Sequence, residues 1–250
     1  QLSLHAGIVV EREGTVDRED LFSLGCRDGL GALHKTCEKT LTGIALKFDS
    51  RKAYLNSPGF STGRYVDLVY EHNEVLSGVL DSDYQGGVLQ GQWKEVFDLP
   101  GRRSLSLQVI AAQADKKSER MTLGGDNLWT ELSLFGRDDF SLRGYGSTVQ
   151  LGNNLNINRV NYTQWLARVD KGWGIWPIGA GDISADMYVD YGSAWDDRNE
   201  PSYLAGVGID FKIEILAFYN LMMPLKLSFA RGLDKDLGEN RVGLGVSLPY

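Results

Sequence analysis

Arg143, Gly144 and Tyr145 form the short stretch whose residue types point most directly to a specific interaction. They lie within DDFSLRGYGSTVQLGNN, residues 138–154, a long glycine-containing connection that precedes a strand-like run. A guanidinium offers several donors in a planar fork, which fits a carboxylate and stacks on aromatic rings. Such a tip can be a surface turn, or it can reach back into a polar interior. The surrounding elements decide between the two.

Other candidate chemistry finds little support in the sequence. The serines lack a G-x-S-x-G elbow and a matching His and Asp set, and GLGALHK and LGGDN do not open a helix that could bind phosphate. The adjacent carboxylates at 138–139 and 196–197 are expected to be solvated in loops. The three histidines fall in separate segments without metal-binding spacing: His5, His34 and His72. We therefore expect no catalytic residue, metal or cofactor, with a barrel-resident lipase as the enzyme alternative.

Composition restricts the class of protein. The chain has 250 residues, 26 basic and 33 acidic side chains and a net charge of -7, which argues against nucleic-acid binding. No window approaches the roughly 20 apolar residues of a membrane helix. No signal peptide is evident, so we expect the chain to begin at a mature terminus or partway through a longer protein. Cys26 and Cys37 share one polar loop, which favours a local disulfide in an oxidising compartment over free thiols.

The elements that must position these residues are strands, because apolar side chains recur with a period of two. In RVGLGVSLPY, for example, Val242 and Leu244 share a face with Tyr250, opposite Gly243 and Gly245. We expect about ten strands and no helix. The strands lie near 2–12, 40–50, 61–73, 84–97, 102–113, 149–169, 182–194, 203–215, 220–231 and 238–250. Several reach the 9–11 residues of a tilted membrane-spanning strand.

The connections also follow a pattern. Long segments at about 13–39, 74–83 and 114–148 alternate with shorter ones, as in outer-membrane barrels with long external loops and short periplasmic turns. A soluble β-sandwich is the competing interpretation. The non-apolar face is largely Gly, Ser, Asn and Gln with scattered charges, which favours a barrel lumen. Aromatic residues end the apolar face, as an interfacial girdle would.

Three motifs together resemble the C-terminal barrel of the BamA/TamA outer-membrane assembly factor superfamily, also called the bacterial surface antigen family. FDSRKAYLNSPGFSTG is similar to the family's Asp-x-Arg … Pro-x-x-Gly turn, with Asp49, Arg51, Pro58 and Gly59 near the expected spacing. LGGDN … FSLRGYG resembles its Gly-Gly … Arg-Gly-Tyr loop signature. YVDYGSAW resembles its aromatic-x-Asp-x-Gly strand, with the motif residues Tyr188, Asp190 and Gly192.

The resemblance implies an all-β, antiparallel transmembrane barrel, of which residues 1–250 are one domain. The chain would supply the last ten strands of what is usually a sixteen-stranded barrel, with earlier strands absent. Ten strands closing alone, or another subunit completing the sheet, are the alternatives, because open edges are not viable in lipid. Segment 114–148 would fold into the lumen and carry Arg143 to the strand of Asp190. Gly144 would allow a close backbone approach, and Tyr145 would pack on the inner wall.

Two positions depart from the family pattern. The stretch between Gly125 and Arg143 is longer than expected, and Asn161 and Thr163 stand where the family often has a Glu-x-Arg pair. The connection KGWGIWPIGAG, 171–181, carries two tryptophans, which indicates an interfacial anchor or a docking patch for a soluble partner.

By this resemblance the chain is expected in the bacterial outer membrane, assisting insertion, assembly or translocation of proteins. Its partners would be outer-membrane lipids, client outer-membrane or secreted proteins, and periplasmic or lipoprotein partners. A client strand would add at a weak seam beside the final strand, which carries Gly243, Gly245 and Tyr250. A passive pore, the membrane anchor of a larger assembly, and a lipid-handling member of the superfamily are the alternative functions.

Overall fold

The architecture was analysed in a computed structural model of the chain. It describes residues 1–14, 26–27, 33–34, 36–53, 59, 61–73, 82–118, 120–125, 140–172, 178–197, 199–217 and 221–246. Of residues 9–14, 26–27, 33–34, 36–39, 170–171, 217, 221–222 and 246, the backbone alone is described. Within these ranges the chain forms strands, turns and loops, and no helix long and apolar enough to cross a membrane is present.

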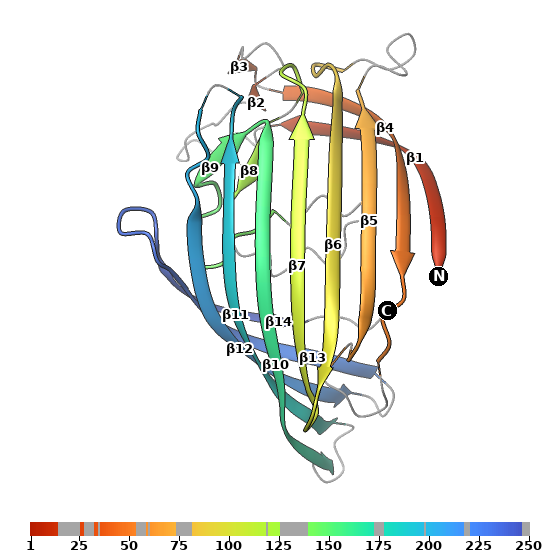
Figure 1. The fold of residues 1–250 in the computed structure, drawn as a ribbon, viewed down its shortest axis with the longest axis vertical. Coiled ribbons are helices and arrows are strands. Elements are labelled where there is room, and N and C mark those ends of the chain that lie inside the picture. Colours follow the sequence, from red (N-terminus) through yellow and green to blue (C-terminus); the bar gives the residue numbers. More distant parts are fainter. Residues whose placement is uncertain are drawn as a thin grey trace.

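Ten strands form one antiparallel sheet, ordered β1-β4-β5-β6-β7-β10-β11-β12-β13-β14 (Figure 1). Their bounds are β1 Leu2–Gly14, β4 Thr36–Asp49, β5 Gly63–His72, β6 Gly87–Leu99, β7 Arg103–Ala114, β10 Asn154–Gly172, β11 Ile178–Trp195, β12 Leu204–Ala217, β13 Leu221–Gly232 and β14 Asn240–Val246. Two short pairs lie outside this sheet: β2 Cys26–Arg27 with β3 Leu33–His34, and β8 Met121–Leu123 with β9 Gln150–Gly152. The ten-stranded antiparallel sheet expected from the period of two is therefore present.

One expected strand, 149–169, is divided in the structure. Residues 150–152 form β9 and pair with β8, while the main-sheet strand β10 begins at Asn154. Asn153 marks the break, because its backbone oxygen accepts a hydrogen bond from Ala114 N at 2.7 Å and its side-chain amide donates to Asp115 O at 3.0 Å. Alternation of apolar residues cannot reveal such a change of partner, since Leu151, Leu155 and Ile157 keep the same parity across the break.

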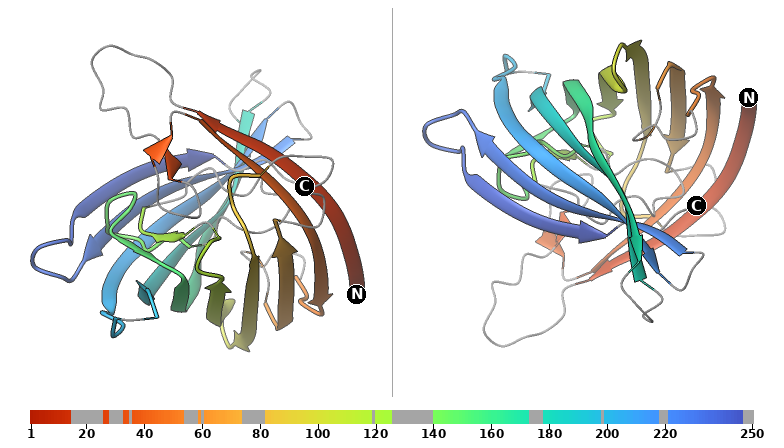
Figure 2. Two further views of the ribbon diagram at one scale, coloured as in Figure 1. Left: turned by 90° about the horizontal axis from the view of Figure 1, so that it is seen from above. Right: turned by 90° about the horizontal axis from the view of Figure 1, so that it is seen from below.

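The sheet is strongly curved (Figure 2). Its two faces differ in the side chains that they carry. On the convex outer face, large apolar side chains from nine of the ten strands, all but β7, are exposed, up to 74% for Leu4 on β1 and 70% for Val242 on β14. On the concave inner face, polar and charged side chains are buried, including Asp67, Gln108 and Asp190. Strand pairing without register shifts over most of the sheet keeps each set on its own face.

The apolar core lies on the concave side, at the end of the sheet that carries the long connections. There β8 and residues 140–149 pack against the inner faces of β6, β7, β10, β11 and β12. The buried members of this cluster are Val88, Ile110, Ala112, Ala114, Met121, Leu123, Leu142, Tyr145, Leu155, Ile157, Ala194 and Leu204. Within the segment between β7 and β10, β8 and residues 140–145 are thus folded onto the inner face, whereas residues 115–117 and 120 are exposed.

Candidate functional site

The Arg143 guanidinium and the Asp190 carboxylate form a two-bonded ion pair on the inner face. Arg143 Nε donates to Asp190 Oδ2 at 2.6 Å, and Arg143 Nη2 donates to Asp190 Oδ1 at 2.5 Å. The Asp190 side chain is fully buried and that of Arg143 is 17% exposed. The contact anticipated from the sequence is present, and its fork geometry is one that an ammonium group cannot reproduce.

Two neighbours on adjacent strands complete the surroundings of Arg143. Its Nη2 also donates to Asn161 Oδ1 on β10 at 3.0 Å, and its guanidinium carbon lies 3.3 Å from the ring centroid of Tyr188 on β11. Asn161 and Tyr188 are directly opposite each other in the sheet. Strand β10 therefore supplies a neutral amide where the resembled family often supplies a charge, and Arg143 remains bound.

A second arginine binds the same segment at Ser141, two residues before Arg143. Arg159 on β10, which is opposite Asp190 in register, donates through Nη2 to Ser141 O at 2.5 Å and to Ser141 Oγ at 3.0 Å. The segment 141–143 is thus held to the inner face by one arginine of its own and one from the sheet. Arg159 was not among the predicted site residues. The alternation along β10 places its side chain on the inner face, but its partner, Ser141, depends on the path of the loop, which alternation does not report.

Gly144 brings the segment into backbone contact with β13 and with the turn that leads into β14. Its φ is +90°, and a Cβ at this position would overlap the backbone nitrogen of Gly232 and the carbonyl carbon of Arg231. Gly144 O accepts a hydrogen bond from Glu239 N at 2.9 Å. Only glycine combines this φ with so close an approach.

Tyr145 is fully buried and contacts β12, β13 and β14. Its hydroxyl donates to Ala205 O on β12 at 2.5 Å, its backbone forms a bridge with Gly238, and its carbonyl accepts a hydrogen bond from Arg241 Nη1 on β14. Residues 143–145 consequently contact five elements in succession, from β10 to β14, and act as a brace across the end of the sheet. We refer to residues 141–145 as the inner brace.

Below the inner brace, β11, β12 and β13 carry further ion pairs on the inner face. Lys212 Nζ lies 2.5 Å from Asp186 Oδ2, and Lys226 Nζ lies 3.9 Å from Asp210 Oδ2. Asp186 is opposite Asp210 in register, and Lys212 is opposite Lys226. The two carboxylates therefore form one row across the strands and the two ammonium groups form the next row. Each ion pair joins a carboxylate of one row to an ammonium group of the other row on the neighbouring strand. Sequence parity shows that these charges face inward, but not which of them meet.

The turn motif lies at the opposite end of the sheet. Arg51 Nη2 donates to Asp49 Oδ2 at 2.7 Å, and its guanidinium carbon lies 4.5 Å from the Tyr65 ring centroid. Gly59 has φ +120° with open space where a Cβ would stand, and Pro58 lies outside the described residues. Asp49 and Arg51 thus form a local clamp between β4 and β5, remote from the inner brace.

The other predicted site residues either lie away from the inner brace or are not fully described by the structure. Gly192 is buried on the inner face of β11, and Gly243 and Gly245 face inward on β14, which pairs with β13 alone among the described strands. Tyr250 lies outside the described residues. Cys26 and Cys37 lie in β2 and β4, but their side chains are not described, so their disulfide stays a prediction.

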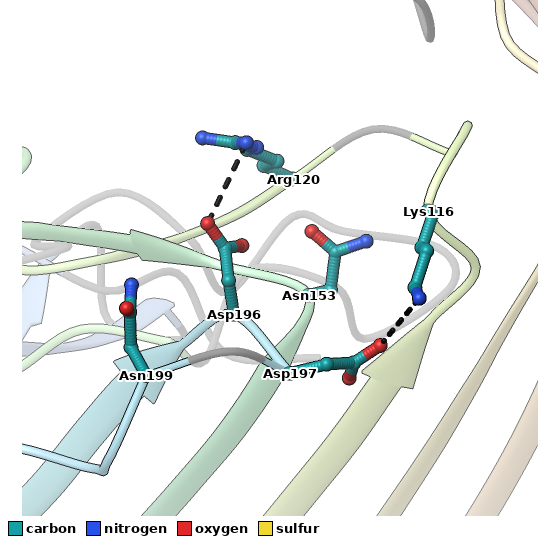
Figure 3. A pocket seen from close by; sticks show the side chains of 6 residues that line it. All are labelled: Lys116, Arg120, Asn153, Asp196, Asp197 and Asn199. Carbon is teal, nitrogen blue, oxygen red and sulfur yellow. Dashed lines mark ion pairs between the residues drawn. The ribbon is translucent and has the colours of Figure 1, made fainter.

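A cavity of about 300 Å³ opens at the loop end, lined by Lys116, Arg120, Asn153, Asp196, Asp197 and Asn199. Figure 3 shows its ion pairs, Lys116 with Asp197 and Arg120 with Asp196, both at 3.5 Å. The Asn154 amide, which donates to Asp197 Oδ1 at 2.9 Å, lowers the pKa of Asp197, and Lys116 adds to the effect. These contacts tie the β7–β8 connection to the loop after β11.

Among the described residues no group of three or more His, Cys, Asp or Glu side chains is arranged to hold a metal ion. The arrangement that stands out is the inner brace, with buried, charge-assisted contacts between distant parts of the chain. Compared with known proteins, the chain matches no family model and no curated sequence.

Proposed function

We propose that the chain is the β-barrel part of an outer-membrane protein of the BamA-like superfamily, and that it assists insertion, assembly or translocation of other proteins. The observation that carries this proposal is the inner brace: the Arg-Gly-Tyr segment reaches the inner face and contacts Asp190 of the aromatic-x-Asp-x-Gly strand. These are two of the three motifs on which the resemblance rests, and they lie far apart in sequence.

The chemistry of the two faces supports a membrane setting. A soluble sheet of this size would cover one apolar face with a second layer, yet large apolar side chains on the outer face of nine of the ten strands are exposed. The buried face carries ion pairs and amides, which suits the polar interior of a barrel. In this setting the long connections lie outside the cell, the short turns lie in the periplasm, and further strands complete the barrel.

A client strand would add at the seam beside β14. This strand pairs with β13 along seven residues, Leu225 to Arg231 facing Val246 to Asn240, and two inward glycines contribute no packing to it. The inner brace contacts β14 through Arg241 and the preceding turn through Glu239. We infer that the brace holds the end of the seam strand while the rest of that strand stays available for pairing.

The experiment that tests this function is client folding in vesicles that contain the purified chain. A urea-unfolded small outer-membrane barrel should insert faster into these vesicles than into empty ones, as followed by heat-modifiable gel migration. A steady ion conductance without any acceleration would instead indicate a passive pore. Transfer of labelled lipid between vesicles without acceleration would indicate lipid handling. Solubility as a monomer without detergent would contradict the membrane setting itself.

A further inference from the structure

Strand β10 extends well beyond its neighbour β7 at the end of the sheet with short turns (Figure 1). The ladder between β10 and β7 ends at Gln164 opposite Arg103, and the last backbone hydrogen bond runs from Trp165 N to Arg102 O at 3.2 Å. Residues 166–172 continue as a strand and pair with β11. We call residues 166–172 the β10 extension. Among the described residues, no strand pairs with its β7-side edge.

The side chains of the β10 extension are exposed where they are described. Leu166 is 48% exposed and Val169 is 40% exposed, and Ala167 and Arg168 are exposed as well. An uncovered strand edge presents backbone donors and acceptors that a further strand can pair with. Two apolar side chains beside such an edge provide the contacts that an added strand would cover.

The extension is held in place from the concave side. The Arg102 guanidinium carbon lies 4.4 Å from the ring centroid of Trp165, and Trp165 Nε1 donates to Asp182 Oδ1 at 3.1 Å. Arg168 Nε lies 3.5 Å from the same Asp182 oxygen. Arg102 is the one described non-glycine residue with positive φ, +58°, so the backbone is strained where this cluster forms. Preorganisation of this kind lowers the cost of binding.

The charged residues around the β10 extension indicate what kind of segment would bind there. Arg102 and Arg103 are exposed at the point where the free edge begins, and Arg168 lies within it. Asp182 is engaged by Trp165 and Arg168, and Asp98 lies on β6, beyond β7. Asp170 and Lys171, also in the extension, offset each other in formal charge, so the three arginines leave a net basic surrounding around the backbone groups and apolar contacts of the edge. Two register shifts in the β10–β11 ladder, between Trp165 and Ala167 and between Arg168 and Lys171, limit the added strand to a short one.

We propose that the β10 extension is a docking edge for one short, extended, acidic segment of a partner polypeptide, which adds to β10 as a strand. In the membrane setting this edge faces the periplasm, so the partner is a periplasmic one. The inference does not depend on client insertion, because it needs only the edge, the apolar side chains and the arginines.

The test uses the full chain in neutral detergent micelles and a fluorescent octapeptide of alternating Val and Glu. We expect saturable binding by anisotropy, and slower hydrogen exchange in residues 166–172 when the peptide is bound. The same peptide with N-methylated backbone nitrogens should bind at least about tenfold more weakly, because it cannot donate to the edge. Equal binding of both peptides would overturn strand addition, as would full exchange protection of 166–172 before any peptide is added.

The charge component is tested with Arg103→Glu, compared with Lys117→Glu at the other end of the sheet. Both sites are exposed, so both variants should fold, which heat-modifiable migration checks. Arg103→Glu should weaken peptide binding about tenfold, and Lys117→Glu should leave it unchanged. Equal binding by the two variants would refute the acidic partner. Binding to phosphatidylglycerol vesicles through Arg103 without peptide binding would assign the surface to lipid and overturn the proposal.

Discussion

At the scale of single residues, the Arg143–Asp190 pair should stabilise the folded chain by a measurable amount. Arg143→Ala and Asp190→Ala should each lower the free energy of unfolding in micelles by about 1–3 kcal/mol, the range for charge-assisted hydrogen bonds. The double variant should lose clearly less than the sum, because the two groups share one interaction. Arg143→Lys should recover only part of the loss, since it lacks the fork.

The exposed pair between Lys116 and Asp197, 3.5 Å apart in the loops at one end of the sheet, is the control for these variants. Lys116→Gln should have little effect on the free energy of unfolding, because solvent screens exposed ion pairs. Fully additive losses for Arg143 and Asp190 would show that the pair does not act as a unit.

Gly144 and Gly59 offer a matched comparison of steric demand. Both have positive φ, but a Cβ at 144 meets backbone atoms of β13 while one at 59 meets open space. Gly59→Ala should cost about 1 kcal/mol from backbone strain alone. Gly144→Ala should cost at least about 2 kcal/mol, because β13 must also move. Denaturant unfolding of both variants gives the comparison, and equal costs would mean that the brace does not need its close approach.

At the scale of elements, the turn between β13 and β14 has a carboxylate that caps it. Asp234 Oδ1 accepts hydrogen bonds from Leu237 N and Asp236 N, both at 2.9 Å, and these lower the pKa of Asp234. A lowered folded-state pKa means that this contribution is present above the unfolded value and is lost as pH falls through the folded one. Carboxyl NMR should show Asp234 titrating below an ordinary aspartate, and Asp234→Asn should remove the effect. An ordinary titration midpoint would contradict this cap.

Cys26, in β2 between β1 and β4, and Cys37, at the start of β4, are predicted to form an external disulfide. Mass mapping of unreduced protein should give one linked peptide containing Cys26 and Cys37. Two thiols open to alkylation in freshly isolated membranes would rule the bond out. A Cys26→Ser variant is the control, since it should release Cys37 for labelling.

The sequence allowed the strands and their inward and outward faces to be predicted, because period two reports the two sides of a pleated sheet. It also gave Arg143 and Asp190 as partners, since the motifs that contain them resemble a known pairing. The diagonal pairs Asp186–Lys212 and Asp210–Lys226 were not predicted, because they depend on the register between strands. Parity is a property of one strand, whereas register is a property of two. The break at Asn153 was missed for the same reason.

At the scale of the whole molecule, the exposed apolar face should behave as a lipid contact. Val189, 49% exposed at the middle of β11, should tolerate charge poorly in a membrane and well in water. Val189→Arg should destabilise the chain in vesicles by about 2–4 kcal/mol, the cost of a lipid-facing charge near the midplane. Glu200→Arg, in the exposed loop after β11, is the control and should have little effect. Equal stability of both variants would contradict a lipid-facing outer surface.

The diagonal ion pairs also bear on the order of events when the chain enters a bilayer. Each pair joins two different elements: Asp186 on β11 to Lys212 on β12, Asp210 on β12 to Lys226 on β13, and Asp190 on β11 to Arg143 of the brace. A lone strand crossing lipid would carry its charges unpaired, at about 2.5–3.5 kcal/mol each. In the proposed membrane setting, β11, β12 and β13 must therefore associate at the bilayer surface and cross together. Time-resolved quenching by brominated lipid should report one concerted step for these strands, and a separate arrival of β11 would refute it.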